Sequence, residues 1–229
     1  MSDTLPKSGQ LLVNGVDLRA DLSGALIWPE RRLAAVADLH FEKGTAFAAR
    51  GQFLPPYDTQ ATLDKLEAVI ARHQIEQVIC LGDSFHDGAA AERLDPAQAA
   101  RIQALTARLD WTWIAGNHDP APPADWGGAV AEEMTLGALT FRHEAEAASR
   151  GGEVSGHFHP KAAVRVRGKR VTAACFVTDG RRLILPAFGA FTGGLNVLDP
   201  AIAGLFKHGF QATLLGRAGL FVFPKAALV

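Results

Sequence analysis

The chain has 229 residues, of which 48% are hydrophobic, and its formal net charge at pH 7 is −1. This length and composition suit one α/β domain over residues 1–229, with a core large enough to fold by itself. The balanced charge excludes a protein that binds nucleic acid through an overall basic field. Cys80 and Cys175 both lie in apolar runs, so we expect two buried free thiols rather than a disulfide framework.

The sequence carries no export or membrane signal that we can identify. The N-terminal residues lack a basic stretch followed by an apolar stretch, which is the pattern of a secretory signal. No run approaches the roughly 18 apolar residues of a membrane span. We therefore expect a cytoplasmic protein that does not bind membranes.

Apolar runs in the first half predict a series of strands. Residues 10–18 form two such runs around Asn14-Gly15, a pair typical of a two-residue β-hairpin turn. Further strands are expected at 25–28, 32–37, 77–81 and 111–115.

Two helices are expected between these strands. One spans 60–73, with Asp58 or Thr59 as its N-cap, and the other begins at Asp95-Pro96, a capping residue followed by an N1 proline. Strands that alternate with helices predict parallel pairing through right-handed crossovers.

After residue 130 the pattern changes to successive β-runs separated by glycine-containing turns. This half predicts a second sheet that is largely antiparallel. Together the two halves predict one domain with two packed sheets.

Metal-ligating residue types follow the ends of the predicted strands. Asp38, Asp83 and Asn117 lie there. So do five of the eight histidines, which are His40, His118, His143, His157 and His159. Loops at the carboxyl ends of strands converge on one crevice in α/β sheets. In Asp38-x-His40 and His157-x-His159, extended alternation would place both side chains of each pair on one face. We expect these side chains to meet in one site.

Carboxylate, imidazole and amide ligands without a thiolate suit Mn²⁺, Fe or Zn²⁺. The set is too large for one ion, but two ions that share Asp83 would use it, and such pairs serve phosphoryl chemistry. Two divalent ions with Asp38 and Asp83 leave a positive surplus, which a bridging hydroxide and a phosphodiester would neutralise. The residues therefore predict a dinuclear centre that acts on an anionic ester.

The ordered blocks resemble the calcineurin-like metallophosphoesterase superfamily: Asp38-x-His40, Gly82-Asp83, Gly116-Asn117-His118-Asp119, His143 and Gly156-His157-Phe158-His159. The stretches DLHFEKG, LPPYDT, LGDSFHDG and LPAFGAFTGGLNVLDP are similar to the bacterial ligase-associated DNA damage response endonuclease family, PdeM. The resemblance implies a four-layer α/β/β/α sandwich with two mixed sheets. It also implies a DNA endonuclease of DNA repair, with two metal ions, Mn²⁺ first and Fe or Zn²⁺ as alternatives, and association with a DNA ligase and helicase.

Carried over by position, the resemblance implies two ligand sets. The first ion would take Asp38, His40, Asp83 and His159, and the second Asp83, Asn117, His143 and His157. A hydroxide that bridges the two ions would then attack phosphorus in line.

The resemblance also implies two catalytic residues that are not ligands. His118 would face the phosphate and protonate the leaving oxygen, and Asp119 would hold the other ring nitrogen of His118. Asp119 could instead cap a turn before Pro120. The superfamily often has Gly-Asp-x-x-Asp, whereas here His86 stands at that last position and Asp87 follows, so the roles of both stay open.

Residues 161–170 contain five basic residues directly after the last histidine motif. The pattern fits a strand with a solvated outer face, or a basic rim in which Arg165, Arg167 and Lys169 contact a polynucleotide backbone. Lys43 and Arg182 are weaker candidates for such a rim.

Two other functions remain open at this stage. The dinuclear core does not choose between diester and monoester, so a small-molecule phosphatase or nucleotide phosphodiesterase is the alternative. The other possibility is a scaffold of this fold without catalytic activity, similar to the retromer scaffold subunit. The presence of His118, the expected catalytic histidine, disfavours it.

Overall fold

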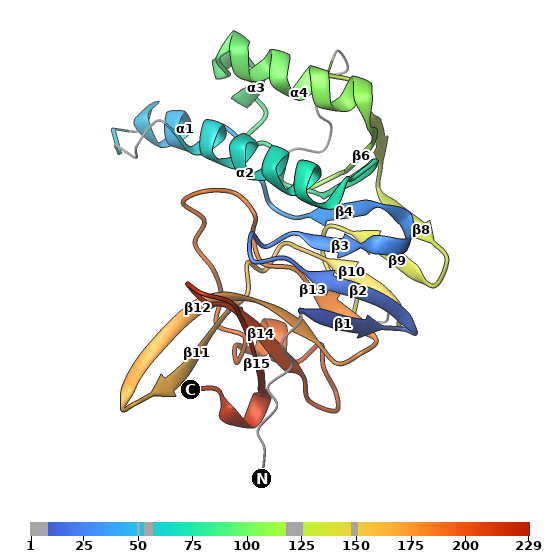
Figure 1. Ribbon diagram of the computed structural model, residues 1–229. Helices are drawn as coiled ribbons and strands as arrows, with labels where there is room; N and C mark the ends of the chain where they lie inside the picture. Colours follow the sequence, from blue (N-terminus) through green and yellow to red (C-terminus); the bar gives the residue numbers. More distant parts are fainter. Residues whose placement is uncertain (1–8, 50, 53–56, 118–125, 148–150) are drawn as a thin grey trace.

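A computed structural model describes residues 9–49, 51–52, 57–117, 126–147 and 151–229. Its first sheet has the strand order β1-β2-β3-β4-β5-β6-β7 (Figure 1). The strands are β1 (Gln10–Val13), β2 (Val16–Ala20), β3 (Leu26–Trp28), β4 (Leu33–Val36), β5 (Gln77–Leu81), β6 (Asp110–Ile114) and β7 (Ala129–Ala131). Strands β1 to β4 pair antiparallel and β4 to β7 pair parallel, so the sheet is mixed.

The predicted strands of this half are confirmed, and so is the first hairpin. Asn14 has φ 48° and Gly15 has φ 80°, the positive values that its two-residue turn requires. The predicted parallel pairing is also present, because Ala34 lies opposite Val78 and Val78 lies opposite Trp111.

Among the described residues, four helices belong to the first half of the chain. They lie on the outer face of the first sheet (Figure 1). They are α1 (Lys43–Ala49), α2 (Asp58–His73), α3 (Ala90–Arg93) and α4 (Pro96–Arg108). Helices α2 and α4 bury one apolar stripe each, including Leu63 and Leu66 on the first and Ile102 and Leu105 on the second. These stripes form one core with the outer face of the sheet.

The start of α4 is confirmed, because the Asp95 carboxylate accepts from the backbone N–H of Ala97 at 2.8 Å. The predicted cap of α2 is wrong, since Tyr57 holds the N-cap position. Asp58 Oδ2 instead accepts from Gly44 N (2.9 Å), so this carboxylate joins α2 to α1. Helix α1 itself was not predicted, because its seven residues show no apolar periodicity of useful length.

The second sheet has the order β15-β14-β12-β13-β10-β9-β8, with β11 paired to β12. Its strands are β8 (Glu133–Leu136), β9 (Leu139–Arg142), β10 (Glu153–Ser155), β11 (Lys161–Val166), β12 (Lys169–Thr178), β13 (Arg182–Ile184), β14 (Gln211–Leu215) and β15 (Leu220–Pro224). The predicted antiparallel character holds except at β10, which pairs parallel with both neighbours. Short helical turns are α5 (Pro200–Ala203), η1 (Pro29–Arg31) and η3 (Lys225–Ala227).

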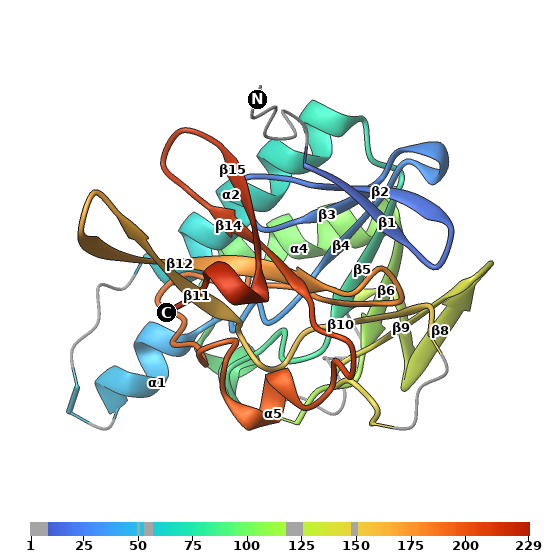
Figure 2. The ribbon, with the colours of Figure 1, turned by 90° about the horizontal axis from the view of Figure 1, so that it is seen from below.

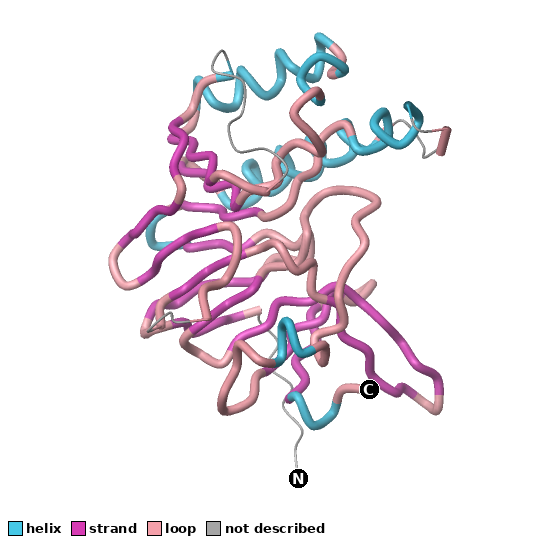
Figure 3. The backbone as a smooth tube through the Cα atoms, turned by 180° about the vertical axis from the view of Figure 1, so that it is seen from behind, coloured by secondary structure: helices cyan, strands magenta, loops and turns pink. Residues whose placement is uncertain are grey.

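The two sheets pack face to face around a second core that includes Leu26, Phe141 and Phe176. A third cluster, with Ile202 and Phe206, covers the outer face of the second sheet. Figures 2 and 3 show that the helices gather mainly on the first sheet, whereas loops and α5 cover the second. The predicted α/β fold with two mixed sheets is confirmed.

The chemistry of the cysteines agrees with the sequence analysis. Cys80 and Cys175 are both buried thiols outside any disulfide, and burial raises the pKa of the Cys175 thiol. Within the described residues, no helix combines the length and the apolar character that crossing a bilayer demands.

Candidate metal centre

The loop after β4 runs beside the loop after β5. His40 N donates to Asp83 O (2.9 Å), and Phe41 N donates to Ser84 O (2.8 Å). These bonds continue the parallel pairing of β4 and β5 beyond the strands themselves. As a result Asp83 lies beside the Asp38-x-His40 segment.

Six of the seven predicted ligands meet in two clusters, and in each cluster the ligand atoms all lie within 4.8 Å of one another. We call these clusters site 1 (Asp38, His40, His159) and site 2 (Asp83, His143, His157). The segments that carry them follow the ends of β4, β5, β9 and β10, so both sites lie at one edge of the paired sheets.

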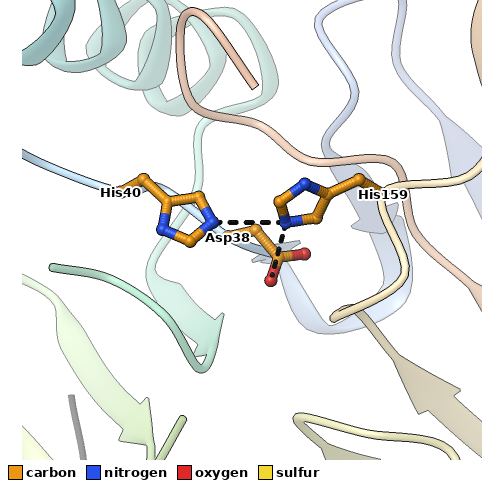
Figure 4. Close-up of side chains that lie close together, drawn as sticks. All are labelled: Asp38, His40 and His159. Carbon is orange, nitrogen blue, oxygen red and sulfur yellow. Dashed lines mark hydrogen bonds and ion pairs between the residues drawn. The ribbon is translucent and has the colours of Figure 1, made fainter. Parts of the chain in front are cut away.

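In site 1 the donor atoms point toward one another (Figure 4). His40 Nε2 lies 3.2 Å from His159 Nε2, and His159 Nε2 lies 3.4 Å from Asp38 Oδ1. Two nitrogens bound at about 2.1 Å to one tetrahedral ion would be about 3.4 Å apart. The spacing therefore fits ligands of a common divalent ion.

Site 2 has the same geometry and a fixed tautomer. His143 Nε2 lies 3.5 Å from Asp83 Oδ1 and 3.1 Å from His157 Nδ1. The other nitrogen, His143 Nδ1, donates to the carbonyl of Leu81 at 2.9 Å, because a carbonyl can only accept. This bond leaves the Nε2 lone pair of His143 directed at the cluster, as in many metal-binding histidines.

The position before Asp83 has room only for a glycine, Gly82. A Cβ at this position would come within 2.4 Å of His143 Nδ1, and the backbone of Gly82 has φ 73°. Any side chain here would displace the His143 ring from site 2.

The two sites adjoin at Asp38. The backbone N–H of His157 donates to both carboxylate oxygens of Asp38, at 3.2 Å and 3.0 Å. Asp38 Oδ1 also lies 4.0 Å from His143 Nδ1. A side chain of site 1 thus contacts two residues of site 2, which is the proximity that a dinuclear centre needs.

The ligand segments are not extended, which corrects the expected strand alternation. Positive φ angles occur at five of the six residues: Asp38 (55°), His40 (46°), Asp83 (47°), His157 (69°) and His159 (46°). Asp38 and His40 share site 1, but His157 and His159 fall in different sites, so the second half of that prediction is wrong. Left-handed backbone costs non-glycine residues of order 1–3 kcal/mol each and concentrates at functional sites.

The burial of the Asp38 and Asp83 carboxylates is a further argument that the two sites bind cations. Asp38 is 0% exposed and Asp83 is 4% exposed. A buried carboxylate is costly unless it is paired or bound to a metal. Within the described residues, the ion-pair partners of Asp38 are the histidines His143 and His159, so divalent ions fit this donor set.

The remaining predicted site residues are placed as follows. Asn117 follows β6 and is exposed, and its role as a ligand stays a prediction. His118 and Asp119 lie outside the described residues. Asp87 accepts from Arg93 at 2.8 Å in an ion pair. The His86 ring lies 5.8 Å from the ring of the ligand His40.

The basic candidates separate into exposed and buried ones. Arg165, Arg167 and Lys169 are exposed on the β11–β12 hairpin, which projects from the body in Figures 1 and 2. Arg182 is wrong as a rim residue, because it is buried and its Nε lies 2.5 Å from Glu153 Oε2.

Glu42 is a buried residue that sequence reasoning missed. Its Oε1 accepts from Thr59 Oγ1 (2.9 Å), its Oε2 accepts from Thr45 Oγ1 (2.7 Å), and its N–H donates to Thr59 Oγ1 (2.9 Å). Because Glu42 lies two residues after His40, these bonds tie the loop of site 1 to α1 and α2. No local sequence pattern marks such a contact.

Comparison with known proteins agrees with this geometry. The family profile "Calcineurin-like phosphoesterase" matches residues 31–179, which include both sites. The chain belongs to this family and is a metal-dependent phosphoesterase with two candidate sites for divalent ions. No curated protein matches the chain significantly.

Two solved structures indicate how similar the chain is to particular proteins. The nuclease MPE of Pseudomonas putida is 31% identical, with a TM-score of 0.73 over 94% of this chain and 100% of that chain. The phosphoesterase Yfce of E. coli is 13% identical, with a TM-score of 0.43 over 85% of this chain and 98% of that chain.

Proposed function

We propose that the protein is a dinuclear metal-dependent phosphodiesterase that cleaves DNA as an endonuclease. The observation that carries this proposal is the pair of adjoining clusters, each with one carboxylate and two imidazoles aimed at a common point. Two ions held there would supply Lewis-acid charge for a phosphodiester and a nucleophile at neutral pH.

The chain's own residues would do three things in this reaction. Asp38 and Asp83 would hold the cations, and the Leu81 carbonyl would keep His143 in the tautomer that binds metal. His118, as the family resemblance implies, would donate a proton to the leaving oxygen, with Asp119 orienting its ring.

DNA as the substrate is supported by the likeness to the Pseudomonas putida nuclease along most of the chain. The β11–β12 hairpin adds a second argument, because Arg165 lies directly opposite Arg170 across the two strands. Like charges opposite each other are unfavourable, and a phosphate backbone would relieve the repulsion. Arg165, Arg167 and Lys169 are accordingly proposed as outer backbone contacts.

The finer features of the proposal rest on the family resemblance. They are Mn²⁺ as the metal, with Fe or Zn²⁺ as alternatives, a role in DNA repair in the cytoplasm, and association with a DNA ligase and helicase. We also propose that residues 1–229 act as one metallophosphoesterase domain.

The test is cleavage of a covalently closed circular single-stranded DNA with Mn²⁺. The wild type should yield linear product, because a circle has no ends for an exonuclease. His118→Ala should still bind metal but turn over roughly 10²- to 10⁴-fold more slowly, since it lacks the proton donor. This variant also controls for contaminating nuclease.

Two outcomes would count against the proposal. An intact circle with folded, metal-loaded wild type would refute the endonuclease and favour a small-molecule phosphatase or nucleotide phosphodiesterase. Full activity of His118→Ala would refute the assigned proton donor.

A further inference from the structure

The loop between β13 and α5 lies against site 1 and is held there on two sides. Gly189 N donates to the backbone carbonyl of Asp38 at 3.1 Å. Ala190 N donates to Thr62 Oγ1 of α2 at 3.2 Å. Figure 1 shows this orange loop rising from the second sheet toward α2. Its position relative to the metal centre is therefore fixed.

Lys65 of α2 strengthens this attachment. Its Nζ donates to Phe188 O and lies 3.9 Å from the centroid of the Phe188 ring. Burial lowers the pKa of Lys65 to about 8. A partly buried ammonium is unfavourable by itself, so the contacts with Phe188 must compensate for its desolvation.

Phe191, the next residue of this loop, is exposed and has an unfavourable backbone conformation. Its φ is 55° and its exposed fraction is 47%. Positive φ is a genuine outlier for a bulky residue, and the exposed ring gains little from burial in return. Because Gly189 and Ala190 anchor the backbone just before it, this exposed ring lies near the phosphoesterase centre and is available for stacking on a planar group.

Lys161 lies along the same loop. It follows His159 by two residues, and its Nζ donates to the carbonyl of Thr192 at 3.3 Å. The aliphatic part of Lys161 passes over Gly194, where a Cβ would come within 2.8 Å of Cε. The ammonium is thereby directed to the residue next to Phe191.

Lys43 brings a second positive charge to this place. It follows His40 by three residues, and burial lowers its pKa, the Asp58 carboxylate raises it, and the charge of Lys161 lowers it further. Within the described residues, neither lysine has a carboxylate oxygen within 4.0 Å of its Nζ. Asp58 offsets part of the charge of Lys43, and an anion that contacts both ammoniums would relieve the remaining repulsion between Lys43 and Lys161.

We propose that Lys43, Lys161 and Phe191 form a flanking-nucleotide subsite beside site 1. The two ammoniums hold the phosphate next to the scissile one, and the Phe191 ring stacks on the attached base. This inference rests on the proposed action on DNA and assigns the residues that favour a polynucleotide over a small ester. The subsite is separate from the proposed backbone contacts of the β11–β12 hairpin, Arg165, Arg167 and Lys169, which lie farther along the chain from His159.

Binding of a labelled single strand of about 12 nucleotides tests the subsite. The full chain is used without added metal, so that cleavage does not intervene, and affinity is measured by anisotropy over a range of salt concentrations. Lys43→Gln and Lys161→Gln should each weaken binding about fivefold at 0.1 M salt and reduce the logarithmic salt slope by about 0.7. The matched control is Lys207→Gln, an exposed lysine after α5, which should bind as the wild type does.

Phe191 should show a different signature. Phe191→Ala should weaken single-strand binding about fivefold or more without changing the salt slope, because stacking releases no counterions. Phe191→Tyr should restore the affinity, and binding of a duplex of the same length should not depend on the ring. Thermal melting of each variant checks that it is folded.

The possible failures are distinguishable. If the wild type cleaves the circular DNA but the lysine variants keep the wild-type affinity and slope, the subsite is refuted and the endonuclease stands. If the wild type leaves DNA intact while the lysine variants lose slope, the endonuclease is refuted and the subsite stands. A wild type that does not bind the strand refutes the subsite.

Discussion

Two of the buried groupings of aspartate with histidine among the described residues, the Asp38 grouping and the Asp21 grouping, do opposite things with similar residues. Asp38 joins His40 and His159 in site 1, while Asp21 accepts from His73 Nε2 at 2.8 Å after β2. Asp38 is 0% exposed and Asp21 is 8% exposed, so burial does not distinguish them.

The difference lies in the other partners. Asp21 also accepts from Arg72 at 2.9 Å and from the backbone N–H of Ser23 at 2.8 Å. Burial of the Asp21 carboxyl opposes its ionisation, but the hydrogen bonds from His73 and Ser23 and the charge of Arg72 overcome this and hold its pKa at about 2. The grouping is neutralised within the protein and needs no ion.

Site 1 lacks this internal neutralisation. Within the described part of the chain, the hydrogen bonds and ion pairs of the Asp38 carboxylate come from histidines and one backbone N–H. A buried carboxylate with histidines therefore indicates a metal site when arginine and lysine are missing from its neighbours and the backbone is left-handed. Three measurements test this difference between Asp38 and Asp21.

The largest expected effect is on catalysis. Asp38→Asn should lower Mn²⁺-dependent hydrolysis of bis(p-nitrophenyl) phosphate by at least about 10³-fold, because the amide keeps the shape but removes the charge that holds the cation. Asp21→Asn makes the same chemical change in a buried position and should keep most of the activity. The measurement is the steady-state rate of each variant at saturating Mn²⁺. An Asp38→Asn rate within tenfold of the wild-type rate would contradict the prediction that Asp38 holds a catalytic metal ion.

The next effect is stabilisation by metal, which needs no activity. Mn²⁺ at about 100 times its dissociation constant should stabilise the wild type by about 2.7 kcal/mol, since the ion binds only the folded centre. For a chain of this size that corresponds to a rise in Tm of roughly 5–10 °C.

A second pair of substitutions, Asp21→Asn and Asp83→Asn, separates the Asp21 grouping from the metal centre in this measurement. Asp21→Asn should keep the Mn²⁺-dependent rise in Tm, whereas Asp83→Asn should lose most of it. Equal rises in the wild type and Asp83→Asn would show that the ion binds elsewhere.

The smallest effect is on stability in acid. The pKa of Asp21 in the folded protein lies below its ordinary value of 3.8, so its ionised form stabilises the fold by about 2 kcal/mol at pH 6. This contribution is present above pH about 4 and is lost as the pH falls toward 2, with about half remaining at pH 3. Urea unfolding with chelator at pH 3 to 6 should show the wild type and Asp21→Asn converging as the pH falls. A constant gap between them would disprove the depressed pKa.

Much of the fold was predictable because its signals are local. The Asn14-Gly15 turn, the Asp95 cap and the strands β4, β5 and β6 follow from patterns within a few residues. Helix α1 and the start of α2 were missed because contacts between distant segments decide them, such as the bond from Gly44 N to Asp58.

In the candidate site, too, some features follow from local sequence patterns and others depend on contacts between distant segments. Histidines at strand ends, His143 included, pointed to a common edge, but the assignment of His143 to the second ion came only from the family resemblance. The separation of His157 from His159 depends on two left-handed residues, and the engagement of Arg182 depends on Glu153 in another strand. Neither can be read from spacing.

The distance along the chain between neighbouring ligands has a consequence for how the protein matures. His40 and His159 are 119 residues apart, yet their Nε2 atoms are 3.2 Å apart. Closing so long a loop is entropically costly in an unfolded chain, so the ligands cannot gather before the two sheets pack. During synthesis the centre can form only after residue 159 has been made, and metal uptake would then report completed assembly rather than the folding of a segment.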